Sequence, residues 1–284
     1  MPTGMLYICP TPIGNLGDVT VRTLEVLRSV DVVCAEDTRV TGKLLAAYGI
    51  SKPIERLDEE ALSKRGEYIV ERIALGEKIA YCSDAGMPGV SDPGLRLVEA
   101  ARAAKVNVEV LPGASAVTTA YVTGGFLNPQ FYFGGFLPRK RQEQIGVLSL
   151  LKSLDACLVF YESPVRLVAS LSTIAEIFPY REVAVCRELT KLHEEVYRGL
   201  SSKVHDTFRK RKEEGSIKGE IVIVIDAAGA EEQAVDTESM RARAQVRVVE
   251  LKAQGLHTNK DIVALLQSEF SIPRNTAYDI VVGK

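Results

Sequence analysis

The chain has 284 residues, of which 46% are hydrophobic and 25% are charged. These proportions are typical of globular proteins and exclude collagen-like or wholly disordered architecture. Lys and Arg number 35 against 37 Asp and Glu, which excludes a uniformly basic coat but allows a local basic patch. The length suggests two domains at about 150 residues each. The first ten residues lack the basic and apolar segments of a signal peptide, so we expect a cytoplasmic protein.

Histidine and cysteine are too scattered along the chain to suggest a metal or redox centre. The three histidines are His193, His205 and His257, which argues against a His-based metal site or a Ser–His relay. Five cysteines occur without a CxxC pair, as expected for small buried side chains in a reducing compartment. We therefore expect no bound metal.

Short β-rich runs alternate with amphipathic helical segments along most of the chain. The runs rich in Val, Ile, Cys and Tyr lie at 6–12, 31–37, 78–84, 106–112, 156–162, 182–189 and 220–227. Helical periodicity lies between them, as at 19–30, 66–76 and 94–106. Near-continuous apolar runs are expected for strands covered on both faces, so the alternation predicts an α/β fold built on βαβ units.

The composition changes at two places along the chain. Segment 126–144 is aromatic, then rich in Gly and Pro, then basic, and it predicts a junction between an α/β domain at 1–122 and a second α/β domain at 123–228. Residues 229–240 are small and acidic without apolar periodicity, which is typical of a linker. Short helical patterns follow, so 229–284 is predicted to be a linker with a helix-turn-helix-like C-terminal domain.

Loops rich in Gly and Pro, with carboxylates among them, follow the predicted strands. They read TPIGNLGD (11–18), AEDTR (35–39), SDAGMPGVSDPG (83–94), LPGASA (111–116), YESPVR (161–166) and RELTK (187–191). Each loop alone is more often an ordinary turn. Ligands of open α/β sheets, however, bind outside the carboxyl ends of the strands, where these loops emerge together. No GxxxxGK[ST] or GxGxxG pattern is present, which excludes a P-loop nucleotide site and a standard dinucleotide fold.

Taken in order, eight motifs resemble the tetrapyrrole methylase superfamily and, within it, the ribosomal small-subunit RNA methyltransferase I branch. They are TPIGNLGD, AEDTR, SDAGMPGVSDPG, LPGASA, FYFGGFLPRK, FYESPVRL, RELTKLHEE and KGEIVIVI. The GGFLPRK and YESPVR segments separate this branch from the porphyrin-modifying enzymes. The resemblance implies two α/β domains with S-adenosyl-L-methionine in the cleft between them. It also implies a homodimer that 2′-O-methylates a cytidine in the decoding region of small-subunit (16S) rRNA.

The resemblance also implies residue roles. Residues placed near the cofactor are Pro12, Gly14, Asp84, Gly86, Val90, Ser115, Ala116 and Tyr161. One departure stands at 57–60, where the branch usually carries a His-rich stretch and this chain reads Leu-Asp-Glu-Glu. No role for those histidines can be carried over to this chain.

The hydroxyl of a ribose is a weak acid, so a carboxylate or lysine within hydrogen-bond reach would help to remove its proton. The candidate catalytic residues are Asp37, Glu162 and Glu188, with Lys191 less suited. Candidate substrate-binding residues, which would clamp phosphates, are Arg39, Arg139, Lys140 and Arg166. Two alternatives stay open at this point, namely a C-methyltransferase of tetrapyrrole rings and a non-catalytic RNA-binding protein that holds S-adenosylmethionine.

Overall fold

The computed structural model describes residues 4–255, 257–270 and 272–283. Residues 1–3 lie outside the described residues. They belong to the N-terminal segment in which no signal peptide is expected. The chain forms two compact units, Met1–Ala227 and Ala228–Lys284. The larger unit carries two sheets, and the smaller unit is helical.

The first sheet is parallel throughout. Its strands are β1 (Met5–Ile8), β2 (Val32–Ala35), β3 (Ile54–Arg56), β4 (Lys78–Cys82) and β5 (Asn107–Val110). They pair in the order β3-β2-β4-β1-β5. The order changes direction around β4 and β1, and their carboxyl ends are therefore the place where such a sheet binds ligands.

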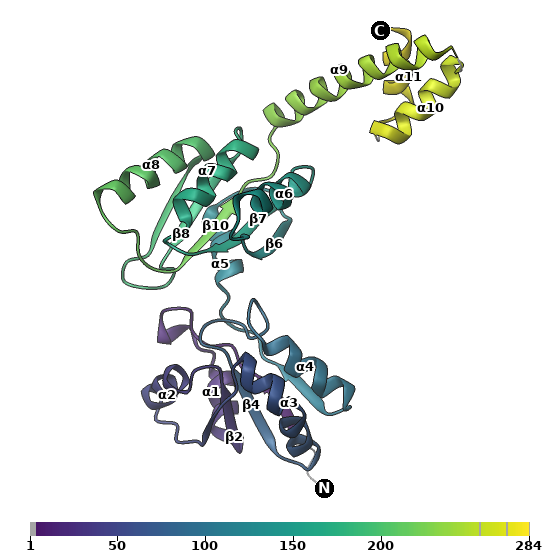
Figure 1. Ribbon diagram of the computed structural model, residues 1–284. Helices are drawn as coiled ribbons and strands as arrows, with labels where there is room; N and C mark the ends of the chain where they lie inside the picture. Colours follow the sequence, from purple (N-terminus) through teal and green to yellow (C-terminus); the bar gives the residue numbers. More distant parts are fainter. Residues whose placement is uncertain (1–3, 256, 271, 284) are drawn as a thin grey trace. The chain divides into compact units, whose positions relative to one another are not determined.

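Helices cover both faces of the first sheet (Figure 1). On one face, α1 (Val21–Ser29) and α2 (Thr38–Ala47) bury Leu27 and Leu45. On the other, α3 (Glu59–Ala74) and α4 (Gly94–Ala103) bury Ile69 and Leu97 against the strands. This double cover explains why the strands read as continuous apolar runs in the sequence.

The second sheet is mixed, which differs from the βαβ units predicted for the whole chain. Its strands are β6 (Phe131–Phe136), β7 (Cys157–Glu162), β8 (Glu182–Arg187), β9 (Glu195–Leu200) and β10 (Ile221–Ile225). They pair in the order β6-β7-β10-β8-β9, and β6–β7 is parallel while the other pairs are antiparallel. The loop from β8 to β9 is too short for a crossover helix, so these strands pair as a hairpin.

Helices cover this sheet on both faces as well. One face packs against α6 (Arg141–Leu151), α7 (Leu167–Ile177) and α8 (Ser201–Glu214) through residues such as Leu171 and Phe208. The other face packs against α5 (Ala116–Gly124). The predicted fold class, two α/β regions followed by a helical C-terminal region, is confirmed.

The smaller unit consists of α9 (Ala230–Gln254), α10 (Asn259–Phe270) and α11 (Arg274–Val282), packed around Leu251 and Leu266. Segment 229–240 was predicted to be a linker, but from Ala230 it is the first part of α9. Ala, Glu, Gln and Met favour helix even where no apolar stripe marks one. Among the described residues, no helix is long and apolar enough to cross a membrane. The domain limits at residues 122 and 228 stay predictions.

Candidate active site

The larger unit contains a pocket of about 440 Å³ to which both sheets contribute residues. Its size is within the usual range for small-molecule sites. The first sheet supplies the loops that follow β1, β2 and β4, and the turn before α5. The second sheet supplies the ends of β6 and β7, the loop after β8, and the start of β10.

Backbone hydrogen bonds join the loops after β1 and β4. Thr11 and Gly86 donate to each other's carbonyl oxygens, each over 2.9 Å, and Thr11 Oγ1 donates to the carbonyl of Ser83 over 3.1 Å. Gly86 has φ +79°, a conformation that favours glycine. The pairing brings Ile13 and Gly86 to the wall of the pocket.

An aspartate closes the long loop between β4 and α4. Asp92 Oδ1 accepts hydrogen bonds from the backbone of Gly89 (2.6 Å) and Gly94 (2.8 Å). A Cβ on Gly94 would lie 2.8 Å from the Gly89 nitrogen, so the loop closes this tightly only with glycine there. The loop is thus held in one conformation, with Asp84, Val90 and Asp92 lining the pocket.

Three carboxylates from the first sheet, those of Glu36, Asp84 and Asp92, line the pocket. Partial burial and then the negative charge of Asp84 raise the pKa of Glu36, although the Asp84 backbone N–H offsets part of this. Asp92 and Asp58 add to the rise. Within the described part of the chain, Glu36 forms no salt bridge, so its carboxylate remains a comparatively strong base.

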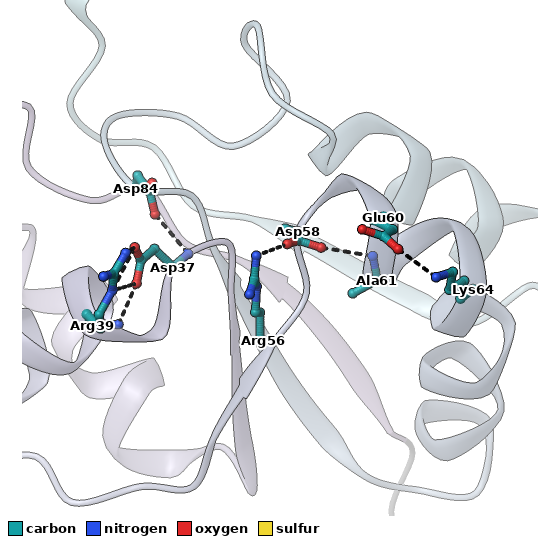
Figure 2. Close-up of polar contacts among 8 residues, drawn as sticks. All are labelled: Asp37, Arg39, Arg56, Asp58, Glu60, Ala61, Lys64 and Asp84. Atoms are coloured by element: carbon teal, nitrogen blue, oxygen red, sulfur yellow. Dashed lines mark hydrogen bonds and ion pairs between the residues drawn. The ribbon is translucent and has the colours of Figure 1, made fainter.

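Asp37, the neighbouring residue, is in a different environment (Figure 2). Its carboxylate caps α2 and pairs with Arg39, whose guanidinium hydrogen bonds hold the pKa of Asp37 well below its usual range. Its backbone N–H donates to Asp84 Oδ1 over 2.9 Å. Asp37 therefore positions Asp84, while its own side chain is turned to Arg39 and is not part of the pocket lining.

Glu162 lies at the pocket, but its carboxylate is fully buried and engaged by neighbours. It pairs with Arg166 over 2.6 Å and accepts hydrogen bonds from the Ser163 backbone (2.7 Å) and the Ser170 hydroxyl. Arg166 in turn donates to the carbonyl of Leu137 over 3.0 Å. The network joins the ends of β6 and β7. The Arg166 guanidinium is engaged within it, by Glu162 and by the Leu137 carbonyl.

Glu188 is not part of the pocket lining, and it fixes the loop after β8 through Lys191 and the Glu220 backbone. Hydrogen bonding from Lys191 and then from the Glu220 backbone lowers the pKa of Glu188. Lys191 also pairs with Glu220, which lines the pocket. The loop reaches the first half of the unit, because the Asn15 backbone donates to Thr190 Oγ1 over 3.1 Å.

Gly14 marks the close approach of these two loops. A Cβ there would lie 2.4 Å from Lys191 Cγ and 2.9 Å from the Leu189 carbonyl oxygen. Only glycine allows the loop after β1 to approach the loop after β8 this closely. Pro12 and Gly14 themselves flank Ile13, the residue of this loop that lines the pocket.

The structure brings most of the predicted cofactor residues to one place. Six of the eight line the pocket, and they are Asp84, Gly86, Val90, Ser115, Ala116 and Tyr161. The predicted phosphate-binding residues are more dispersed. Arg39, Arg139 and Lys140 are exposed, and Lys140 pairs with Glu143 over 3.2 Å. These roles stay predictions.

Residues 57–60, the stretch without histidines, lead into α3, which begins at Glu59 after the cap residue Asp58; Figure 2 shows Asp58 and Glu60. Asp58 caps the helix by accepting from the Ala61 backbone over 2.9 Å, and it pairs with Arg56. Glu60 pairs with Lys64 one turn later over 2.6 Å. None of the four residues lines the pocket.

Several other residues line the pocket without having been selected from the sequence, and those with polar or aromatic side chains include Glu36, Ser83, Asp92, Phe136 and Glu220. Glu36 could have been selected, because it directly follows β2 and so lies closer to the sheet edge than Asp37. Phe136 could not, because its position depends on an irregularity in β6.

Comparison with known proteins identifies the family to which this architecture belongs. The model of the family described as Tetrapyrrole (Corrin/Porphyrin) Methylases matches residues 5–205. A ribosomal RNA small subunit methyltransferase I from Thermotoga maritima is 45% identical over 75% of this chain and 96% of its own length. The protein of that name from Bacillus subtilis is 39% identical over 97% of this chain and 93% of its own length. The chain belongs to the tetrapyrrole methylase family, in the ribosomal RNA small subunit methyltransferase I branch.

Solved structures agree on the fold of this tetrapyrrole methylase. A diphthine synthase superposes with a TM-score of 0.61 at 16% identity, covering 78% of this chain and 90% of its own. A cobalt precorrin-4 methyltransferase superposes with a TM-score of 0.59 at 17% identity, covering 78% and 94%. At these identities the likeness shows the fold alone.

The cofactor of this family is S-adenosyl-L-methionine, and the chemistry of the pocket fits it. The molecule carries positive charge on its sulfonium and ammonium groups, and the first sheet lines the pocket with three carboxylates. The Ser83 hydroxyl is buried at the pocket and has no hydrogen-bond partner among the described residues. A buried hydroxyl left in this way is costly, and a polar ligand would satisfy it.

Proposed function

We propose that this methyltransferase transfers a methyl group from S-adenosylmethionine to the 2′-hydroxyl of a cytidine in the decoding region of 16S rRNA. The observation that carries the proposal is a pocket to which the first sheet contributes three carboxylates, the acidic wall, and the second sheet contributes the rings of Phe136 and Tyr161, the aromatic wall. Relatives that span nearly the whole chain carry the name of small-subunit rRNA methyltransferases. The acidic wall suits a cationic donor, and the aromatic wall suits a nucleobase.

The residues that would hold the cofactor are those at the rigid turns of the first sheet, 84–90 and 115–116, with Pro12 and Gly14 supporting them and Tyr161 opposite. When bound, S-adenosylmethionine supplies an electrophilic methyl group on a good leaving group. Burial followed by the charges of Asp92 and Glu220 raises the pKa of Tyr161 to about 12. The Tyr161 phenol therefore stays neutral and acts as a wall and hydrogen-bond donor.

Proton removal from the ribose hydroxyl is assigned to Glu36 Oε. A general base works best when its pKa approaches the working pH, and the surroundings of Glu36 move its pKa upward. The surroundings of Asp37 and Glu188 move theirs downward. Within this proposal, Asp37, Glu162 and Glu188 are positioning residues that hold Asp84, Arg166 and Lys191.

The matched pair Glu36→Gln and Asp37→Asn tests the identity of the base. We expect Glu36→Gln to lower kcat about 10²- to 10⁴-fold, with calorimetric binding of S-adenosylmethionine changed less than threefold. In wild type, log kcat should rise with pH through the ionisation of Glu36 and then level off, and Glu36→Gln should lose this rise. Asp37→Asn keeps a capping side chain and should retain most of kcat. A larger loss of kcat in Asp37→Asn than in Glu36→Gln would contradict the assignment.

The proposed substrate is tested with radiolabelled S-adenosylmethionine. The acceptors are small ribosomal subunits from a strain that lacks the corresponding methyltransferase and, separately, a porphyrinogen. We expect label in 16S rRNA, at a nucleotide whose 3′ linkage resists alkaline hydrolysis. Label in the porphyrinogen would support a tetrapyrrole methylase instead. RNA binding without transfer to either acceptor would support a non-catalytic role.

We further propose that the protein works as a homodimer, as the resemblance implies, and that it is located in the cytoplasm. Light scattering on the purified full chain tests the dimer, for which a mass near twice that of one chain is expected. Fractionation of cells tests the location, and recovery of the protein with the membrane fraction would contradict it.

A further inference from the structure

Phe136 is an unusually exposed aromatic side chain at the pocket. It lines the pocket while 56% of its surface is open to solvent. Exposing a large apolar ring is unfavourable unless a ligand or partner covers it. Phe136 therefore offers an open aromatic surface at the pocket, and the local structure shows how that position is reached.

A β-bulge places Phe136 on the pocket side of the sheet. Phe133 pairs with Val159 and Phe136 with Tyr161, so three steps along β6 match two along β7. In a regular strand, residues three apart point to opposite faces. The extra residue brings Phe136 to the same face as Phe133, and bulges near active sites commonly redirect a side chain in this way.

Two glycines make this bulge possible. Gly135 has φ +67°, which favours glycine strongly. A Cβ on Gly134 would lie 2.2 Å from Cε1 of Phe160, so the strand needs glycine there too. The Gly134–Gly135 pair thus fixes the backbone immediately before Phe136.

The Phe136 ring is held from beneath and left open toward the pocket. It contacts Tyr161 edge to face, with ring centroids 5.4 Å apart, and Phe133 contacts the same tyrosine at 5.0 Å. Edge-to-face packing orients a ring without covering both of its faces. Phe136 therefore presents an aromatic surface that its contact with Tyr161 orients.

The residues that follow are basic and exposed. Arg139 and Lys140 come three and four residues after Phe136, at the start of α6. An aromatic ring beside exposed cations is the combination that binds a base and its flanking phosphates in single-stranded RNA.

We propose that Phe136 is the stacking platform for the nucleobase of the target nucleotide, which enters the pocket. The inference rests on the proposed RNA substrate. The base lies on the Phe136 ring, and its ribose then faces the wall that carries Glu36. Arg139 and Lys140 hold the adjoining phosphates outside.

Methyl transfer to small ribosomal subunits tests the platform through four variants. Phe136→Ala and Phe136→Leu should lower kcat/KM about ten- to hundredfold, the usual effect of removing one base-stacking ring. Phe136→Tyr keeps the ring and should remain within about threefold of wild type. Tyr132→Ala, on the same strand but outside the pocket lining, is the matched control and should also remain within threefold. Phe136→Leu keeps most of the side-chain volume, so the test survives if Phe136→Ala folds poorly.

A second readout does not depend on turnover. The chain contains no tryptophan, so Phe136→Trp and Tyr132→Trp each introduce a single tryptophan whose emission can be followed separately. With S-adenosylhomocysteine present, deproteinised 16S rRNA should quench Phe136→Trp and leave Tyr132→Trp nearly unchanged. An unquenched Phe136→Trp contradicts the platform.

Calorimetry of S-adenosylmethionine separates the platform from a cofactor contact. Its Kd should be unchanged in Phe136→Ala. A Kd weakened as much as kcat/KM would overturn the proposal and assign the ring to the cofactor. Near-normal kcat/KM in Phe136→Leu, while wild type methylates subunits, contradicts the platform alone. No transfer by wild type contradicts the proposed function itself.

Discussion

The two walls of the pocket are stabilised in different ways. On the wall from the first sheet, hydrogen bonds from backbone N–H groups and glycines fix the loops: Thr11 and Gly86 pair through their backbones, and the Gly89 N–H donates to Asp92 Oδ1. On the wall from the second sheet, side chains fix the loops through the buried Glu162–Arg166 pair and the Glu188–Lys191 pair. The first wall carries three carboxylates, and the second carries two aromatic rings together with Glu162 and Glu220, which are paired with Arg166 and Lys191.

This difference suggests how the two substrates are divided between the walls. Main-chain groups and carboxylates suit a small cationic donor whose shape does not vary. Aromatic rings beside exposed cations suit a polymer whose base must be stacked and whose phosphates must be held. Substitutions on the two walls should therefore have different consequences.

The largest effect is expected from the buried ion pair of the second wall. Glu162→Ala leaves the half-buried Arg166 guanidinium without its carboxylate and removes the acceptor of the Ser163 N–H and the Ser170 hydroxyl, so it should lower the free energy of unfolding by about 3 kcal/mol. Glu176→Ala removes one partner of the exposed Arg141–Glu176 pair and should cost less than about 1 kcal/mol. Urea unfolding of both variants measures the difference. Equal costs would show that Glu162 does not stabilise the second wall.

The next effect concerns the contact between the walls at Gly14. In Gly14→Ala the new methyl group would overlap Lys191 and the Leu189 carbonyl, which forces the loops apart. Such overpacking costs about 1–3 kcal/mol. Because these loops shape the pocket, we expect the affinity for S-adenosylmethionine to fall about tenfold. Gly146→Ala, where a Cβ meets no atom within 4 Å, is the control and should bind normally. Normal affinity in Gly14→Ala would mean that the loop contact does not shape the site.

A smaller effect, specific to RNA, is expected at the rim of the second wall. Arg139→Glu combined with Lys140→Glu should weaken rRNA binding and flatten its dependence on salt, since each lost phosphate contact removes about 0.7–0.9 from the slope. The pair Arg209→Glu and Lys210→Glu changes the same charge on α8 and is the control. An unchanged slope in the first variant would remove Arg139 and Lys140 from the RNA-binding surface.

The smallest effect is a pH-dependent change in stability on the first wall. The folded protein raises the pKa of Glu36 above its ordinary 4.5, so the folded state loses stability as the pH rises through that raised value. Glu36→Gln avoids this cost and should raise Tm by about 2 °C at pH 8, with little change at pH 4.5. A lower Tm at pH 8 would indicate that the Glu36 carboxylate stabilises the fold.

Much of the first wall could be predicted from the sequence. The parallel strands are buried on both faces and read as apolar runs, and their carboxyl ends share one edge. Loops as distant in sequence as those carrying Asp84 and Ser115 could therefore be placed together before the structure was known, and both residues line the pocket. The cysteines were likewise expected to be buried, and all five are.

The second wall was harder to predict, because its geometry depends on irregular or tertiary features. The edge strands β6 and β9 are partly exposed, and β9 alternates along its length, so neither gives a long apolar run. The bulge before Phe136 adds one residue that no periodicity marks. Arg166 was predicted to bind phosphate, but the sequence could not show that Glu162 would be buried beside it.

The central claim is that S-adenosylmethionine binds in this pocket, and calorimetry with one pair of variants tests it most directly. Ala116 lines the pocket at the start of α5, and Val122 lies on the same helix with 74% of its surface exposed. We expect wild type and Val122→Trp to bind S-adenosylmethionine alike, and Ala116→Trp to show no binding heat. Equal binding by all three proteins, or none by folded wild type, would contradict the account.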